Sequence, residues 1–119
     1  MSFPEETMWV CHVSDIPTGT SFGVRFADFG SDDIFFVNNG EGIYAYRNSC
    51  PHWPGSTLPL KKNQYLDSVG EYIICRGHGA VFEIDTGLCI KGACVGQSLT
   101  QVDIKVGELG DIFVFGNKL

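Results

Sequence analysis

Two short stretches decide the fold of this chain: residues 50–55 read CPHWPG, and residues 75–79 read CRGHG. Each stretch holds one cysteine and one histidine with only one or two residues between them. The neighbouring prolines and glycines predict loops, at about residues 48–59 and 75–80, rather than strands or helices. Loops of this kind can turn a thiol and an imidazole toward a shared cavity. The sequence therefore predicts a cage of four metal ligands, made by Cys50, His52, Cys75 and His78.

The rest of the chain consists of short apolar runs separated by glycine-containing turns, with no helical periodicity. Residues 22–26 and 102–106 alternate apolar and polar side chains, as half-buried strands do. Turns at residues 39–42, 85–87 and 107–110 lie between apolar runs and predict hairpins. Further β-rich runs are residues 8–13, 34–37, 43–46, 72–74, 81–84 and 112–115. The pattern predicts an all-β fold.

Length and composition predict a single domain that covers residues 1–119. With 44% hydrophobic residues, a chain of 119 residues can bury a core without disulfide bonds. The net charge of −6 argues against a nucleic-acid interface, which needs clustered Lys and Arg. The N-terminal residues lack the pattern of a signal peptide, and no run approaches the ~20 apolar residues of a membrane span. We therefore expect a cytoplasmic protein that binds neither nucleic acid nor membranes.

The ligand set restricts the metal. Structural zinc sites usually take ligands in pairs of one kind, two cysteines or two histidines close together, whereas each loop here mixes the two kinds. Copper electron-transfer sites add a methionine to two histidines and a cysteine, but Met1 and Met8 both lie far from the loops in the sequence. A [2Fe–2S] cluster with two cysteines on one iron and two histidines on the other matches both loops. A structural zinc module remains the alternative.

The motif Cys50-x-His52, followed after 22 residues by Cys75-x-x-His78-Gly79, resembles that of Rieske proteins. It is most similar to the soluble ferredoxins that serve ring-hydroxylating oxygenases. The likeness continues through residues 81–87, which resemble the family's strand and turn after the second loop, and through a closing hairpin. This resemblance implies a three-layer antiparallel β fold with one [2Fe–2S] cluster at a tip formed by the two loops.

The resemblance also implies an electron carrier rather than an enzyme. An oxidised cluster with two thiolates and two neutral imidazoles has no net charge, so it accepts an electron more easily than a cluster with four thiolates. A fully ligated cluster leaves no open position for a substrate. The expected function is one-electron transfer from an NAD(P)H-dependent reductase to a terminal oxygenase that oxidises aromatic compounds. A Rieske-like small subunit of nitrite reductase is the alternative, although that group often lacks the four ligands.

The chain departs from the respiratory Rieske proteins that it resembles. Gly55 and Gly77 stand where those proteins carry two cysteines that form a disulfide across the cluster. Ala80 and Phe82 stand where they carry a serine and a tyrosine, whose hydroxyl groups donate hydrogen bonds toward the cluster. Without these donors, we expect a potential near the low end of the Rieske range, about −150 mV.

Several residues outside the ligand set receive a predicted role. We expect Trp53 and Arg76, which adjoin the ligands, to frame a transient docking surface for protein partners. His12 lies within a predicted strand, and we expect it to be structural. The remaining cysteines are expected to be inert thiols: Cys11, Cys89 and Cys94.

Overall fold

The computed structural model describes residues 7–25, 33–51, 58, 63–75 and 79–115. Within these ranges the chain forms short strands and one three-residue 3-10 helix, so the predicted all-β class is confirmed. The elements are β1 (Thr7–His12), η1 (Val13–Asp15), β2 (Thr20–Val24), β3 (Ile34–Asn38), β4 (Ile43–Arg47), β5 (Tyr72–Ile74), β6 (Val81–Glu83), β7 (Cys89–Lys91), β8 (Ile104–Val106) and β9 (Asp111–Phe115).

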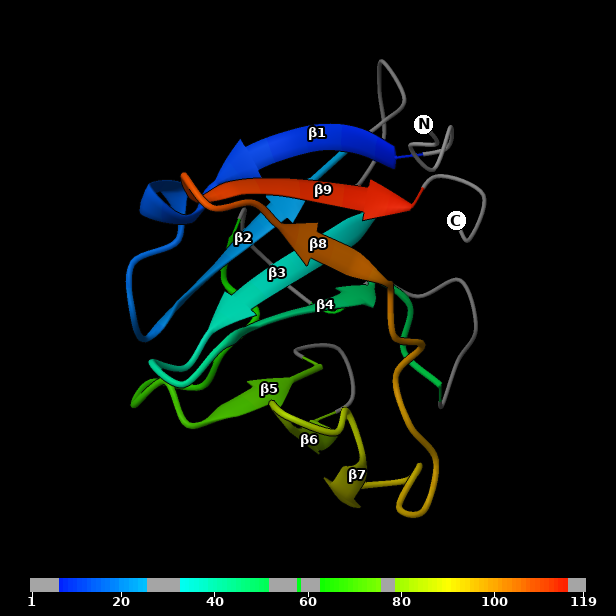
Figure 1. Cartoon of the computed structure of the whole chain (residues 1–119). Helices are drawn as coiled ribbons and strands as arrows, with labels where there is room; N and C mark the ends of the chain where they lie inside the picture. The colour runs from blue at the N-terminus through cyan, green and yellow to red at the C-terminus, as the bar shows by residue number, and fades with distance from the viewer. Residues whose placement is uncertain (1–6, 26–32, 52–57, 59–62, 76–78, 116–119) are drawn as a thin grey trace.

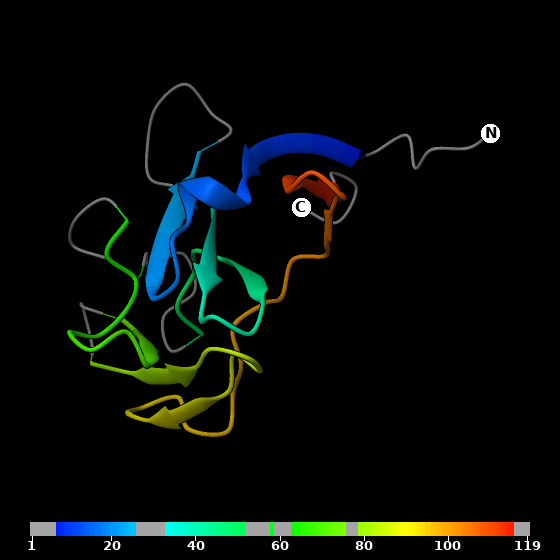
Figure 2. The same cartoon turned by 60° about the vertical axis from the view of Figure 1, so that its left-hand side comes forward.

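The strands form three small antiparallel sheets that stack in layers (Figure 1). The first sheet has the order β1-β9-β8, the second β2-β3-β4 and the third β5-β6-β7. The second sheet lies between the other two, and the turned view keeps this order (Figure 2). The three-layer arrangement that the resemblance implies is therefore confirmed.

The middle sheet is buried on both faces, and β3 shows why. Its four consecutive apolar residues alternate between two cores, because successive side chains of a strand point to opposite faces. Phe35 and Val37 join the core that the second sheet shares with the third. Ile34 and Phe36 join the core that it shares with the first. A continuous apolar run of this kind is typical of a strand covered on both sides.

The predicted turns and strands agree with the structure, apart from one strand that was not predicted and shifts of one or two residues at several strand ends. Residues 39–42, 85–87 and 107–110 connect antiparallel neighbours, as predicted. Strand β7 was not predicted, since its three residues have too little alternation and their pairing with β6 is decided by tertiary context. The strand predicted over residues 102–106 begins only at Ile104. The strand predicted over residues 22–26 is Thr20–Val24, and residue 26 lies outside the described residues.

The first strand ends one residue earlier than predicted because His12 caps the 3-10 helix. Its Nδ1 accepts a hydrogen bond from the Ser14 backbone N–H at 3.1 Å. The hydrogen of the neutral ring is then on Nε2, which donates to the Leu109 carbonyl oxygen at 2.6 Å. These contacts tie the first strand to the turn before β9 and give His12 the structural role that we expected.

Candidate metal centre

The first cysteine of the motif lies just after β4, at the start of the first loop. Cys50 is completely buried. Two residues before it, the Asn48 side-chain oxygen accepts a hydrogen bond from the Leu58 backbone N–H at 2.8 Å. Leu58 is itself fully buried, so this bond brings residues ten positions apart together at the base of the loop. The bond lies close to both ends of the loop predicted at about residues 48–59, but no local sequence signal indicated it.

The chain that returns from the first loop is anchored to β2. Asn63 has a φ of 65°, a left-handed conformation that asparagine tolerates better than most residues. Its side-chain oxygen accepts the Gly23 N–H at 2.7 Å, and its carbonyl oxygen accepts the Ser21 hydroxyl at 2.6 Å. The far end of the loop is therefore held by the middle sheet.

The second loop is closed more tightly. Cys75 directly follows β5 and is completely buried. Its N–H donates to the Ala80 carbonyl oxygen at 2.9 Å, and its own carbonyl oxygen accepts the Gly79 N–H at 2.7 Å. Gly79 has a φ of 74°, which glycine adopts without the steric penalty of a Cβ. This pair of backbone bonds fixes the direction in which Cys75 leaves the sheet.

The fold brings both cysteines into one core, between the second and third sheets. Neither is part of a disulfide bond. Two thiols that arrive from two separately closed loops fit the cysteine half of a cluster site. The other four residues predicted at the tip, namely His52, Trp53, Arg76 and His78, lie outside the described residues, as do Gly55 and Gly77. The residues that the structure describes contain no group of three or more potential metal ligands.

A third segment, which the sequence analysis did not connect with the site, packs against the second loop. Gly92, just after β7, has a φ of 107°, and a Cβ at this position would lie 2.8 Å from the Cα of Ala80. Only glycine permits this approach. Burial, the contact with Cys89 and the proximity of Cys50 raise the pKa of the Cys94 thiol to about 12. Residues 92–94 thus adjoin both cluster loops.

The two positions that lack hydroxyl groups lie beside the cysteines. Ala80 and Phe82 are completely buried and belong to the same core as Cys50 and Cys75. The surroundings of the two thiols in the described part of this core are therefore largely apolar.

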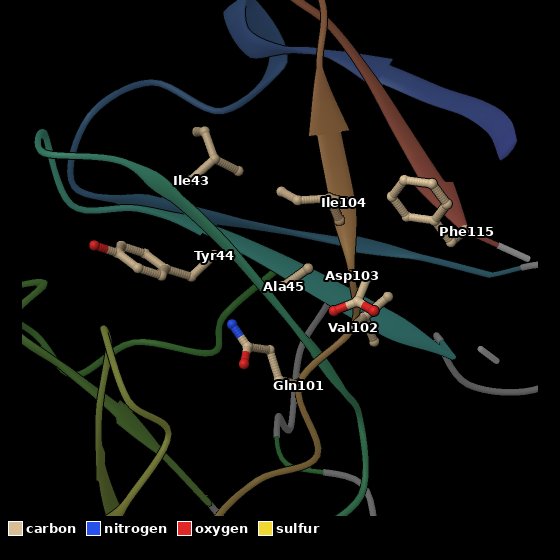
Figure 3. A pocket seen from close by; sticks show the side chains of 8 residues that line it. All are labelled: Ile43, Tyr44, Ala45, Gln101, Val102, Asp103, Ile104 and Phe115. Carbon is tan, nitrogen blue, oxygen red and sulfur yellow. The ribbon is translucent and has the colours of Figure 1, made fainter. Parts of the chain in front are cut away.

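A separate cavity of about 460 Å³ lies between β4 and the segment that leads into β8 (Figure 3). Its walls include Ile43, Ile104 and Phe115, with Gln101 and Asp103 as polar groups. Neither Cys50 nor Cys75 lines it. This cavity belongs to the contact between the first and second sheets and is not part of the candidate metal centre.

No helix in the described part of the chain has the length and apolar character needed to span a membrane.

Comparisons with known proteins agree with this geometry. Residues 6–109 match the model of the Rieske [2Fe-2S] domain. Ferredoxin CarAc of Metapseudomonas resinovorans is 30% identical over 110 residues, which make up 92% of each chain. A chain in the solved complex of reduced oxygenase and oxidized ferredoxin in carbazole 1,9a-dioxygenase is 25% identical, with a TM-score of 0.69 and 94% of both chains covered.

Two more distant structures share the fold. The ferredoxin of carbazole 1,9a-dioxygenase from Nocardioides aromaticivorans IC177 has a TM-score of 0.66 at 22% identity, with 92% of this chain and 97% of that one covered. The Sphingomonas yanoikuyae B1 ferredoxin has a TM-score of 0.67 at 18% identity, with the same coverage. The match to the Rieske domain and the 30% identity to a ferredoxin show that this chain belongs to the Rieske [2Fe–2S] ferredoxins and holds one such cluster.

Proposed function

We propose that this chain is a single-domain ferredoxin that delivers one electron at a time to a terminal oxygenase. The observation that carries this proposal is the pair of buried cysteines, Cys50 and Cys75, presented by two closed loops of a Rieske fold. When bound, the cluster accepts and releases a single electron. The protein holds the two cysteines that would bind one of the irons within a largely apolar core.

The proposed ligands are Cys50 and Cys75 on one iron and His52 and His78 on the other. Two observations support this set. The thiols lie in one core, and each histidine follows its cysteine by two or three residues in the same loop. Because each loop is closed at its base, we expect its cysteine and histidine to lie near each other.

The proposed protein partners are inferred from the ferredoxins that this chain resembles. Ferredoxin CarAc is a ferredoxin by name, and the solved complex pairs an oxygenase with a ferredoxin in carbazole 1,9a-dioxygenase. We infer a terminal oxygenase that oxidises an aromatic compound as the electron acceptor, and an NAD(P)H-dependent reductase as the donor. The chain itself then performs no catalysis, and it works in the cytoplasm beside its soluble partners.

Docking is proposed at the loop tip, where Trp53 and Arg76 adjoin the ligands in the sequence. Redox partners that exchange electrons repeatedly need small, short-lived interfaces. Charged residues at the rim of such an interface act mainly on the association rate, whereas an aromatic residue at its centre contributes to its stability. The two side chains should therefore affect electron delivery in different ways.

Stopped-flow oxidation of the reduced ferredoxin by its oxygenase, over a series of salt concentrations, tests this proposal. Trp53→Ala should slow electron delivery at every salt concentration, and Arg76→Glu should change its salt dependence. Two residues on the first sheet provide matched controls: Trp9→Ala, whose side chain is 55% exposed, and Lys105→Glu. The controls should keep wild-type rates, and all four variants should keep the visible spectrum of the cluster. Wild-type kinetics for both tip variants would show that the oxygenase docks on another surface of the ferredoxin.

A further inference from the structure

Cys89 and Cys94, which the sequence analysis treated as inert, lie in direct contact. Cys89 is the first residue of β7, and Cys94 lies in the turn that follows it. Their sulfur atoms are 2.9 Å apart, with the Cys94 thiol donating to the Cys89 sulfur. Each residue is 1% exposed, although their neighbours Ile90 and Val95 are 41% and 61% exposed. The chain thus turns two thiols inward from an otherwise exposed surface turn.

Backbone hydrogen bonds hold this arrangement. The Cys89 N–H donates to the Gln97 carbonyl oxygen at 2.8 Å, and the Cys89 carbonyl oxygen accepts the Gly96 N–H at 3.2 Å. Within the turn, the Gln97 N–H donates to the Cys94 carbonyl oxygen at 2.8 Å. Since both cysteines are bound into the same small network, the approach of their sulfur atoms is fixed by the backbone.

We propose that Cys89 and Cys94 form a second redox site, a dithiol that hydrogen peroxide converts into an intramolecular disulfide in the folded protein. A disulfide bond is about 2.05 Å long, so the two sulfur atoms need to approach by about 0.9 Å. Small rotations of two side chains cover such a distance. The site uses neither Cys50 nor Cys75 and is therefore chemically separate from the cluster ligands.

The reaction proceeds in two steps. The Cys89 sulfur, which accepts a hydrogen bond from the Cys94 thiol and whose own thiol donates to the Lys91 carbonyl oxygen at 3.3 Å, attacks the peroxide and loses its proton. One peroxide oxygen is transferred to Cys89 as a sulfenic acid, and the other leaves as water. The Cys94 sulfur then attacks the Cys89 sulfur, and the sulfenic hydroxyl group leaves with the Cys94 proton as a second water. In sum, two thiols and one hydrogen peroxide give one disulfide and two waters, and a thiol reductant reverses the change.

Burial of the two thiols limits the rate of this reaction, and their place in the fold determines which segment the disulfide closes. Burial raises the pKa of Cys94, so its proton is present to leave with the sulfenic hydroxyl group. Because both sulfur atoms are covered, only a small oxidant or a brief opening of the exposed turn gives access to them. Once formed, the bond links β7 to the segment that adjoins both cluster loops, and it closes that segment covalently.

The test uses the cluster-loaded protein. It is treated with hydrogen peroxide at concentrations that leave the visible spectrum intact, unfolded in iodoacetamide, digested and analysed by mass spectrometry. The expected product is a peptide in which Cys89 and Cys94 are not alkylated and which is lighter by two hydrogen atoms. Dithiothreitol should restore alkylation of both cysteines. The disulfide should also raise the unfolding midpoint of the oxidised protein.

Three variants make the outcome decisive. Cys89→Ser and Cys94→Ser should each abolish the disulfide and the shift in the unfolding midpoint. Cys11→Ser is the matched control, because Cys11 is a buried thiol in the other core, and it should behave like the wild type. Full alkylation of both cysteines after peroxide treatment would overturn the proposal. A disulfide that joins either cysteine to Cys50 or Cys75, or that forms only after the visible spectrum is lost, would also overturn it.

Discussion

The hydroxyl group of Tyr46 donates a 2.6 Å hydrogen bond to the carbonyl oxygen of Ile84, and this bond joins the second sheet to the third. Tyr46 is fully buried on β4, and Ile84 directly follows β6. The turn after Ile84 fits closely around the same ring, since a Cβ at Gly87 would lie 2.7 Å from a ring carbon of Tyr46. This buried phenol therefore helps to position the sheet that presents Cys75.

Replacement of Tyr46 by phenylalanine should lower the free energy of unfolding by about 1–2 kcal/mol, because the Ile84 carbonyl oxygen loses its donor. Chemical denaturation at pH 7 measures this change. Tyr72→Phe removes the hydroxyl of a partly exposed tyrosine on β5 and should change the stability by less than about 0.5 kcal/mol. Equal effects of the two variants would contradict the role given to the Tyr46 hydrogen bond.

The same phenol predicts a loss of stability at alkaline pH. Burial, and then the nearby Asp85 and Tyr44, raise the pKa of Tyr46 from 10 to about 12. The unfolded chain therefore releases this proton at a lower pH than the folded chain. The contribution of Tyr46 is fully present below pH 10 and is lost as the pH rises toward 12. Cys11 and Cys94, whose pKa values are also raised, act in the same direction, so the difference between wild type and Tyr46→Phe isolates the tyrosine.

Two glycines with the same φ distinguish the stability cost of backbone strain from that of a steric clash. Gly96 and Gly110 both have a φ of 94°. A Cβ at Gly96 would meet no atom within 4 Å, whereas a Cβ at Gly110 would lie 2.7 Å from Nε2 of His12 and 2.9 Å from Val13. Gly96→Ala should cost about 1–2 kcal/mol for the backbone conformation alone. Gly110→Ala should cost at least about 1 kcal/mol more, since it also displaces the His12 ring. Thermal unfolding of both variants measures the difference. Equal unfolding midpoints would show that the His12 ring moves aside without an energetic cost.

The ligand set predicts which cysteines the cluster needs. Thiolates are very difficult to replace on an iron–sulfur cluster, so Cys50→Ser and Cys75→Ser should lose iron and the visible spectrum. Cys11→Ser, Cys89→Ser and Cys94→Ser should keep about two iron and two sulfide per chain. Iron and sulfide analysis of the five purified variants measures this. If Cys89→Ser lost as much iron as Cys50→Ser, the ligand assignment would be wrong.

The apolar surroundings of the cysteines predict the direction in which the potential can be changed. Ala80→Ser and Phe82→Tyr each place a hydroxyl group beside the core that holds both thiols. A hydroxyl that donates toward cluster sulfur stabilises the reduced form, so each substitution should raise the midpoint potential measured by voltammetry. Val81→Thr adds a hydroxyl group at a half-buried position between them and serves as the control. An unchanged or lower potential in both variants, with intact spectra, would show that such hydrogen bonds do not set it.

Local sequence determined the turns and most of the strands of this protein. The β-rich run at residues 112–115 and the glycines in residues 39–42 act over a few residues, because a strand and a tight turn depend mainly on their own side chains and φ angles. The Cys-x-His and Cys-x-x-His spacings are equally local. For the turns and these strands the sequence was sufficient, and the resemblance drawn from the spacings led to the correct fold and family.

Tertiary structure decided what depends on partners far away in the chain. The short strand β7 exists because β6 lies beside it, and the bond from Tyr46 to Ile84 spans 38 positions. The close approach of Gly92 to Ala80 and the contact between the Cys89 and Cys94 sulfur atoms depend on how the third sheet folds back on itself. Spacing alone could only suggest that the two cysteines are near each other. Hydrogen bonds and van der Waals contacts act over a few ångströms in space, whatever the separation in sequence, so only the folded chain shows which groups they join.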